Sequence, residues 1–350
     1  MKVTYTGRMD VGGSGIGTTA WHQVKPLIEE NLLERVYAPA GKKVPEKLLT
    51  KIPDINAPYI VGDIFFDGYT SLTIEKYPEI LQTWGNHCLY QFREFPKAKK
   101  IVNLYSAHPI EQDTLMRGEP NYVSSADSMK KQIKELELAD YIFIPSEFVY
   151  NSLVKHKLQY KAKIVPFGVD LEKFKPRETP KEDDKFQIMF VGQNWLRKGL
   201  IYLLTAFKKL DLKNAELIVA GVQDDLGKAF PLENVKFGWV PDLVKAYQDS
   251  DVFVLPAIED GCPLAVYEAM ACGVPPIVTD TNGTAQHIYN GQNGFIIPPK
   301  SVDAIMDTIK SIYDNRDLGI KMGHQARKTA EAFPWERHEQ EYVKFIKSIT

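Results

Sequence analysis

Residues 252–273 read Val252-Phe-Val-Leu-Pro-Ala-Ile-Glu259-Asp260-Gly261-Cys262-Pro263-Leu264-Ala265-Val266-Tyr-Glu268-Ala-Met-Ala-Cys-Gly273. The apolar run at its start is typical of a buried strand, and a short acidic turn follows it. Pro263 suits the first position of a helix, and Gly273 is typical of a helix end. The stretch therefore predicts a strand, a turn and a helix, which is the repeating unit of a parallel α/β sheet.

The same alternation of short apolar runs and longer helical patterns continues in both directions along the chain. Further strands are expected at Lys2–Thr6, Tyr59–Val61, Lys100–Tyr105, Tyr141–Pro145, Lys163–Phe167, Gln187–Val191, Glu216–Ala220, Val235–Gly238 and Pro276–Thr279, and helices at 301–313, 318–332 and 335–348. This order predicts an α/β fold with parallel sheets that are covered by helices on both faces.

Two domains are expected, because 350 residues at roughly 150 per domain leave room for two. We expect them at 1–170 and 186–330, since residues 170–185 are rich in charge and contain two prolines. A helix over 331–350 carries an apolar stripe of Tyr342, Phe345 and Ile346. The stripe is expected to pack either on its own domain or back on the N-terminal domain.

The composition excludes several classes of protein. The chain has 43 Lys and Arg against 45 Asp and Glu, which gives a formal charge of -2, so a nucleic-acid-wrapping role is not expected. With 44% hydrophobic and 25% charged residues it falls in the ordinary globular range. No apolar run approaches the roughly 20 residues of a membrane-spanning helix.

The cysteines and the start of the chain favour a cytoplasmic location. Residues 1–7 read as a strand rather than as a signal peptide. The three cysteines Cys88, Cys262 and Cys272 are too few and too scattered for a disulfide framework or a structural zinc site. No Asp or His cluster has the spacing of a divalent-ion site, so we expect neither a metal nor another cofactor.

A glycine-rich turn follows the first expected strand, where Gly12, Gly13, Ser14, Gly15 and Gly17 open a helix. Glycines let backbone N–H groups approach a ligand, and a helix N-terminus favours a phosphate. The spacing fits neither a dinucleotide fingerprint nor a Walker loop. The turn is therefore interpreted either as a phosphate or sugar contact or as a merely tight turn.

Three further positions carry candidate chemistry, and each also has a purely structural interpretation. Lys198, in Arg197-Lys198-Gly199 after a strand, is either a diphosphate contact or a solvated basic corner. Glu268 lies inside an apolar helix and is either a partner for ribose hydroxyls or bonded within the protein. His108, at the end of a strand, is either part of an active cleft or a structural residue.

The order of these segments resembles the retaining glycosyltransferases of family 4, which have the GT-B fold of two Rossmann-like domains facing each other across a cleft. The matching segments are Gly12-Gly13, Ala139-Asp140 to Ser146-Glu147, Val165 to Asp170, Phe190-Val191-Gly192, Arg197-Lys198-Gly199, the acidic turn through Glu268 to Pro275, and Asn293-Gly294-Phe295 with Pro298. Each is a weak signal alone, and their common order covers nearly the whole chain. The resemblance implies transfer of a sugar, presumed a hexose, from a nucleoside-diphosphate sugar to an acceptor hydroxyl.

The resemblance also implies roles for individual residues. Lys198 would neutralise the donor diphosphate, Glu268 would hold the ribose hydroxyls, and an acid eight residues earlier would hold the donor sugar. His108 would lie near the reacting sugar. The remaining donor contacts implied are Gly13, Ser14, Gly15, Gln193, Arg197, Trp239, Val240, Glu259, Gly261, Cys262, Leu264 and Ala265.

Three positions depart from the family pattern. Counting back eight residues from Glu268 gives Asp260, while Glu259 stands one position too early, so either acid could hold the donor sugar. The usual arginine of the diphosphate site is Gln193, and Arg197 is a candidate to replace its charge. A later glutamate of the family pattern is Gln286, to which no role is assigned.

The expected mechanism follows from charge. Cleavage of the anomeric bond develops negative charge on the diphosphate, and Lys198 with the N-H groups of Leu264 and Ala265 would stabilise it without a metal. The acceptor would be a carbohydrate, a lipid-linked sugar or a small molecule, with peripheral membrane contact conceivable. Two rivals stay open: a sugar phosphorylase of GT-B architecture, which would use inorganic phosphate and pyridoxal phosphate, and a non-catalytic nucleotide-sugar-binding protein.

Overall fold

The computed structural model describes residues 2–6, 15–37, 74, 77–85, 88–179, 181, 184–222 and 232–350. The chain divides into two compact units. Unit 1 consists of residues 1–113, 123–167 and 335–350, and unit 2 consists of 114–122 and 168–334. The expected strand Tyr59–Val61 and most of the glycine-rich turn, including Gly13 and Ser14, lie outside the described residues.

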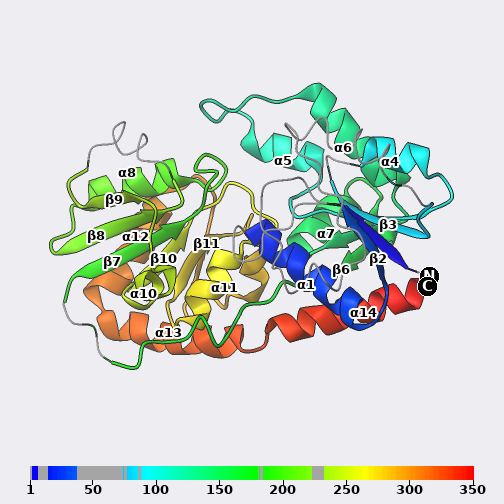
Figure 1. Ribbon diagram of the computed structural model, residues 1–350. Helices are drawn as coiled ribbons and strands as arrows, with labels where there is room; N and C mark the ends of the chain where they lie inside the picture. The colour runs from blue at the N-terminus through cyan, green and yellow to red at the C-terminus, as the bar shows by residue number, and fades with distance from the viewer. Residues whose placement is uncertain are drawn as a thin grey trace. The chain divides into compact units, whose positions relative to one another are not determined.

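Unit 1 contains one parallel sheet in the order β2-β1-β3-β4-β5-β6 (Figure 1). Its strands are β1 (Val3–Thr6), β2 (Leu33–Tyr37), β3 (Ile80–Trp84), β4 (Lys99–Asn103), β5 (Tyr141–Ile144) and β6 (Ala162–Ile164). Its helices are α1 (Gly15–Glu29), α4 (Leu89–Glu94), α5 (Pro109–Met116), α6 (Ala126–Leu138), α7 (Glu147–Val154), the short η1 (Gln159–Lys161) and α14 (Trp335–Ile349). α5 runs across the boundary into the part of the chain counted with unit 2.

Helices cover both faces of this sheet, because successive strand side chains point to opposite sides. In β5, Phe143 joins a core cluster with residues of α1 and α14, whereas its neighbour Ile142 joins a second cluster with residues of α4, α6 and α7. Tyr342 and Ile346 of α14 are fully buried in the first cluster. The apolar stripe of the last helix therefore packs within unit 1, beside α1 (Figure 1).

Unit 2 contains a second parallel sheet in the order β12-β11-β10-β7-β8-β9. Its strands are β7 (Phe186–Val191), β8 (Ala215–Ala220), β9 (Val235–Gly238), β10 (Val252–Leu255), β11 (Pro276–Thr279) and β12 (Phe295–Ile297). Its helices are α8 (Leu200–Leu210), α10 (Leu243–Gln248), α11 (Leu264–Ala271), the short η2 (Gly283–His287), α12 (Val302–Asp314) and α13 (Arg316–Ala330). β7 and β10 are neighbours in the sheet but not in the sequence, so the strand order reverses between them, as in Rossmann-like folds.

Three expected strands of the second half, β9, β10 and β11, have the limits that the sequence predicts, and the other expected strands, with the last three helices, agree to within one or two residues. Two details differ. Pro263 precedes α11 as its N-cap, with an extended ψ of 120°, so the first helical residue is Leu264. Gly273 follows the helix with a φ of +77°, a left-handed conformation that glycine adopts easily. The strands β2 and β3 of unit 1 were not predicted.

The described residues of the charged segment 170–185 belong to unit 2. Phe174 is buried with its ring against Tyr247, and the Lys181 ammonium lies 3.0 Å from Oδ2 of Asp251. The contact-based boundary falls earlier, between residues 167 and 168. The domain limits expected from the sequence, at residues 170, 186 and 330, remain predictions.

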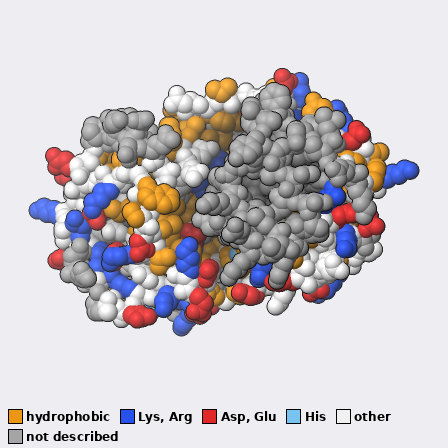
Figure 2. All heavy atoms as spheres, viewed as in Figure 1, with side chains coloured by type: hydrophobic (Ala, Val, Ile, Leu, Met, Phe, Trp, Pro, Cys, Tyr) orange, Lys and Arg blue, Asp and Glu red, His pale blue; other side chains and the backbone are white. Residues whose placement is uncertain are grey.

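The surface carries both signs of charge. On the face shown in Figure 2, basic and acidic side chains of the described residues are interspersed, in keeping with the formal charge of -2. Among the described residues, no helix combines the length and the apolar character needed to cross a membrane. The cytoplasmic location expected from the sequence stays a prediction.

Candidate functional site

The candidate site lies in unit 2, where the strand order of its sheet reverses. Parallel strands that are neighbours in a sheet end at the same edge, and open α/β sheets bind ligands at that edge where the order reverses. The turn after β7 carries Lys198, and the turn after β10 carries Glu259 and Asp260. Two backbone contacts join the turns, since the N–H of Ile258 donates to the carbonyl of Arg197 at 2.9 Å and Gly199 lies against the carbonyl of Pro256.

The turn after β7 has a fixed shape that directs the lysine. The N–H of Lys198 donates to the carbonyl of Asn194 at 3.0 Å, and the N–H of Arg197 donates to Oδ1 of Asn194 at 3.2 Å. The aliphatic stem of Lys198 lies over Gly192, where an added Cβ would stand 3.0 Å from Cδ. Glycine at that position therefore leaves the room that the lysine stem occupies.

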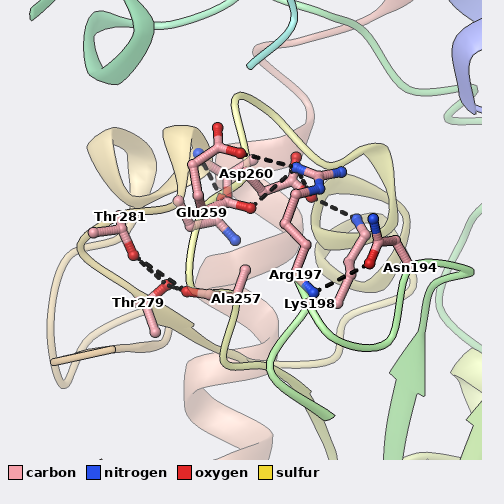
Figure 3. Close-up of polar contacts among 10 residues, drawn as sticks. Asn194, Arg197, Lys198, Ala257, Glu259, Asp260, Thr279 and Thr281 are labelled. Carbon is pink, nitrogen blue, oxygen red and sulfur yellow. Dashed lines mark hydrogen bonds and ion pairs between the residues drawn. The ribbon is translucent and has the colours of Figure 1, made fainter. Parts of the chain in front are cut away.

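Two cations and two carboxylates meet between the turns (Figure 3). The Lys198 ammonium donates to Oδ2 of Asp260 at 2.6 Å. Arg197 donates from Nη1 to the backbone carbonyl of Glu259 at 3.0 Å, and the same nitrogen lies 3.3 Å from Glu259 Oε2 and 3.5 Å from Asp260 Oδ2. Glu259 is fully buried, and Asp260 is 5% exposed. These four side chains form the ion cluster of the site.

The ion cluster keeps Asp260 ionised. Burial alone would raise the pKa of Asp260, but the charges of Lys198 and Arg197 and a hydrogen bond from the backbone N–H of Cys262 lower that pKa below its ordinary value. Burial disfavours the charge of Arg197, yet the pKa of Arg197 is raised because Asp260 and Glu259 lie beside it. Arg197 was the candidate to supply the positive charge that is missing at Gln193. Its charge is already balanced by two carboxylates.

The acidic turn leads directly into α11. Asp260 is fixed by its backbone, since its N–H donates to the carbonyl of Thr281 at 3.1 Å and its carbonyl accepts from Gly283 at 2.8 Å. Nearby, Thr279 and Thr281 donate from their hydroxyls to the carbonyl of Ala257 (Figure 3). The following Gly261 and Cys262 are buried. The N–H groups of Leu264 and Ala265 lie in the first turn of α11, where helix geometry provides them with no intrahelical acceptor.

Glu268 lies one turn further along α11 and is partly exposed. Its Oε2 accepts a hydrogen bond of 2.9 Å from the hydroxyl of Tyr247. Burial raises the pKa of Glu268, and the hydrogen bond and the charges of Lys173 and Lys198 offset part of that rise. Both predicted principal residues, Lys198 and Glu268, thus belong to unit 2.

The remaining unit 2 candidates lie near the same edge of the sheet. Trp239 and Val240 directly follow β9, and the N–H of Gly221 donates to the carbonyl of Gly238 at 3.2 Å across the ends of β8 and β9. The Trp239 side chain is 87% exposed. Gln193 is exposed in the turn after β7.

The other catalytic candidate, His108, belongs to unit 1. Its N–H donates to Oγ of Ser152 at 2.8 Å, its Nδ1 accepts from the N–H of Ile110 at 3.3 Å, and its ring stacks on His156 with centroids 3.6 Å apart. Burial and the neighbouring His156 lower the pKa of His108 to about 4, so the imidazole is neutral at pH 7. Gly15 is the first residue of α1, and Gly13 and Ser14 lie outside the described residues.

Sequence reasoning did not find Tyr247. It occupies an apolar position of the helix before β10, and a tyrosine there reads as core. The only signal was the possibility that a buried phenol needs an acceptor. Among the described residues, no group of three or more His, Cys, Asp or Glu is arranged as a metal ligand set.

Comparison with known proteins gives this unit a family. Residues 170–329 match the model of the family described as "Glycosyl transferases group 1". This segment of unit 2, just under half of the chain, is similar to the group 1 glycosyltransferases. The UDP-Gal:alpha-D-GlcNAc-diphosphoundecaprenol alpha-1,3-galactosyltransferase of Escherichia coli is 30% identical in an alignment that covers 49% of this chain and 50% of that protein.

A second curated relative and two solved structures extend the comparison. The D-inositol 3-phosphate glycosyltransferase of an Arthrobacter strain is 24% identical over 74% of this chain and 64% of its own length. The chain therefore spans half to just under two thirds of these two relatives. Sucrose-phosphate synthase from Thermosynechococcus elongatus aligns with a TM-score of 0.74 at 16% identity, over 100% of this chain and 99% of its own.

The Anabaena protein HepE in complex with UDP-glucose also aligns with a TM-score of 0.74, at 15% identity over 99% of this chain and 100% of its own. These likenesses show the fold of this chain, which is the α/β GT-B fold with two parallel six-stranded sheets. The fold class expected from the sequence is confirmed.

Proposed function

We propose that this chain transfers a hexose from a nucleoside-diphosphate sugar to a hydroxyl group of an acceptor. One observation carries the proposal: the Lys198 ammonium is paired with Asp260 at the edge where the strand order of unit 2 reverses, and the same acidic turn leads into α11, which carries the partly exposed Glu268. A nucleoside-diphosphate sugar offers a matching set of groups, with an anionic diphosphate and ribose hydroxyls. The name of the Escherichia coli relative, which includes UDP-Gal, and the complex of HepE with UDP-glucose support this donor class.

Lys198 and the first turn of α11 would stabilise the leaving diphosphate. An ammonium has three N–H donors, and among the described residues the only hydrogen-bond acceptor of Lys198 Nζ is Asp260. Two donors therefore remain for phosphate oxygens without breaking the ion cluster. The N–H groups of Leu264 and Ala265 add a fixed dipole where charge develops as the anomeric bond breaks.

Asp260 is the better candidate for the donor-sugar acid. Glu259 is fully buried and bonded by Arg197, whereas Asp260 retains some exposure and faces Lys198. Glu268 would accept hydrogen bonds from the ribose hydroxyls. For Trp239 and Val240 we propose contacts with the base, and for His108, Gly13, Ser14 and Gly15 contacts near the reacting sugar and phosphates, as the family resemblance implies.

The finer mechanism is also a proposal. We expect retention of configuration, with the acceptor hydroxyl entering on the face that the diphosphate leaves, and no need for a metal, because the unused N–H donors of Lys198 and the N-terminus of α11 supply the electrostatic stabilisation. Proton NMR of the first-formed product distinguishes retention from inversion by the coupling at the anomeric position. Activity that is unchanged in a chelator supports metal independence, and activity abolished by the chelator overturns it.

The acceptor is proposed as a class only. The two curated relatives have names that include a diphosphoundecaprenol-linked sugar and an inositol phosphate, so lipid-linked sugars and small phosphorylated polyols are the first acceptors to test.

The deciding experiment incubates the chain with UDP-, GDP- and ADP-hexoses and measures release of the nucleoside diphosphate, with and without acceptors. Release with one donor and its loss in Lys198→Ala support the proposal. Sugar release that depends on inorganic phosphate instead would identify a phosphorylase. Tight donor binding with no release under any acceptor would identify a binding protein, and no binding at all would remove the proposal.

A further inference from the structure

Tyr247 links the helix before β10 to the helix after it. It lies in α10, whose first turn is capped by the side chain of Asp242, and its side chain is fully buried. The ring packs edge-on to Phe174, with centroids 6.0 Å apart, and is tilted toward Phe253 at 5.9 Å. The apolar walls fix the ring, so the direction in which its hydroxyl points is also fixed.

That hydroxyl has one acceptor. Tyr247 donates to Oε2 of Glu268 at 2.9 Å, and among the described residues this is the only hydrogen bond of the Glu268 side chain. A buried phenol that loses its acceptor is unfavourable, so the contact restrains both partners. One carboxylate oxygen is therefore engaged, while the partly exposed Glu268 keeps Oε1 for another donor.

We propose that Tyr247 is a positioning residue, which holds Glu268 in the orientation that lets its second oxygen accept a hydrogen bond from the ribose of the donor. The inference rests on the proposed function, since it assigns ribose recognition to Glu268. A carboxylate that can rotate freely must lose that freedom when ligand binds, whereas one held by a rigid phenol has already lost it. Tyr247 should accordingly affect discrimination between ribose and 2′-deoxyribose although it touches neither.

The charged and titratable groups around Glu268 make the pH dependence of nucleotide binding a second, independent test of this role. The groups that act on it are Tyr247 from α10, Lys173 from the segment before β7, Lys198 from the turn after β7 and Cys272 at the end of its own helix. Burial and the charge of Glu268 raise the pKa of the Cys272 thiol to about 12, so this thiol stays neutral at ordinary pH. The hydrogen bond from the Tyr247 phenol stabilises the ionised form of Glu268. Removal of this bond should raise the pKa of Glu268, so nucleotide binding should weaken at a higher pH than in the wild type.

The experiment measures binding of UDP and 2′-deoxy-UDP, and of GDP and 2′-deoxy-GDP, to the full chain by calorimetry between pH 5 and 8. We expect the wild type to prefer the ribonucleotide about ten-fold or more, because a site built around a hydroxyl rejects the analogue that lacks it. Tyr247→Phe should lose most of that preference and bind UDP more weakly at pH 5 than at pH 7. The double variant Tyr247→Phe, Glu268→Gln should be no worse than Glu268→Gln alone.

Tyr202→Phe is the matched control. Tyr202 belongs to α8 of the same unit, and its hydroxyl also donates to a carboxylate, Glu119, at 2.9 Å. Its removal deletes a tyrosine-to-glutamate hydrogen bond away from Glu268, so the ribose preference should be unchanged. Thermal unfolding of each variant verifies that the fold is retained.

The outcomes separate this inference from the proposed function. If the wild type binds none of the nucleotides, or shows no ribose preference that depends on Glu268, the proposed function fails at that step. If the wild type has the preference and Glu268→Gln removes it while Tyr247→Phe preserves both preference and pH profile, only the positioning role is overturned. If Tyr202→Phe loses the preference as well, the effect is a general loss of rigidity and the positioning role is again overturned.

Discussion

The ammonium of Lys198 lies 2.6 Å from Oδ2 of Asp260, and this ion pair joins the turns that follow two neighbouring strands, β7 and β10. Arg197 and Glu259 complete the cluster, so two positive charges are balanced by two negative ones before any donor arrives. The cluster has no surplus positive charge for a diphosphate. Donor binding must then rely on the unused N–H donors of Lys198 and on α11.

Lys198→Ala should remove most of the activity. The ammonium would face the leaving diphosphate, so its loss is expected to lower kcat/KM for the donor about 100-fold or more, equivalent to about 3 kcal/mol. The measurement is nucleoside diphosphate release at several donor concentrations. Lys181→Ala is the control, because the Lys181 side chain is 13% exposed against 14% for Lys198 and is also paired with an aspartate. Equal losses in both variants would contradict a role for Lys198 in the reaction.

Substitution of Glu259 should mainly lower stability, whereas substitution of Asp260 should mainly lower turnover. Glu259→Gln leaves the partly buried Arg197 with less negative charge, so the free energy of unfolding should fall by about 2 to 3 kcal/mol while turnover below the unfolding temperature changes little. Asp260→Asn should reduce turnover more than ten-fold, on the order of 1.4 kcal/mol or more. Urea unfolding and donor turnover are measured on both variants. The reverse pattern would assign the donor-sugar role to Glu259.

The second sheet was predictable from the sequence because its strands are buried on both faces. β10 and β11 are short runs that are buried along their whole length, and α11 follows β10. Since ligands bind where such strands end, the turns that carry Lys198 and Asp260 could be singled out before any coordinates. The ion pair between Lys198 and Asp260 could not be predicted, because it depends on the strand order that makes β7 and β10 neighbours.

The strand β3 escaped prediction for a different physical reason. Its Gln82 and Thr83 are fully buried, so the run Ile80–Trp84 does not read as an apolar strand. Gln82 is satisfied by groups distant in sequence, since it donates to Oδ1 of Asn103 at 3.0 Å and accepts from the hydroxyl of Tyr342 at 2.5 Å. A polar residue whose partners come from other elements looks exposed until the fold is known. Tyr247 was missed in the same way, because its acceptor lies 21 residues further along the chain.

The stability of unit 2 should fall in acid in a manner that depends on Asp260. The pKa of Asp260 is lowered from 3.8, so its ionised form stabilises the folded state above that pH, and the contribution is lost as the pH falls through the lower folded-state value. Unfolding free energy should therefore decline below about pH 4 in the wild type, and Asp260→Asn should flatten this decline. Asp307→Asn, at an exposed position of α12, is the control. A decline that is as steep in Asp260→Asn as in wild type would exclude this carboxylate as its source.

Gly199→Ala should be far more harmful than the same change at another left-handed glycine. Gly199 has a φ of +69°, and an added Cβ would stand 2.0 Å from the carbonyl oxygen of Pro256, so both strain and a backbone clash oppose alanine. Gly291 has a φ of +77° with nothing within 4 Å of the added atom. We expect Gly291→Ala to cost about 1 kcal/mol and Gly199→Ala about 3 kcal/mol or more, with reduced donor binding because the Lys198 turn must move. Similar unfolding midpoints in urea for the two variants would show that the turn can shift without penalty.

Gln193→Arg should strengthen donor binding. Arg197 is held by Glu259 and Asp260, so an arginine at the exposed position 193 would add the site's first unopposed positive charge. One charge at several ångströms from a diphosphate in a solvated site stabilises binding by about 1 kcal/mol, or about five-fold, and less at high salt. Titration with UDP at two salt concentrations measures the effect. Gln292→Arg places the same side chain at another exposed glutamine, before the start of β12 and therefore at the opposite edge of the sheet. If both variants gain equally, the gain comes from net charge alone, and the diphosphate does not lie beside the turn after β7.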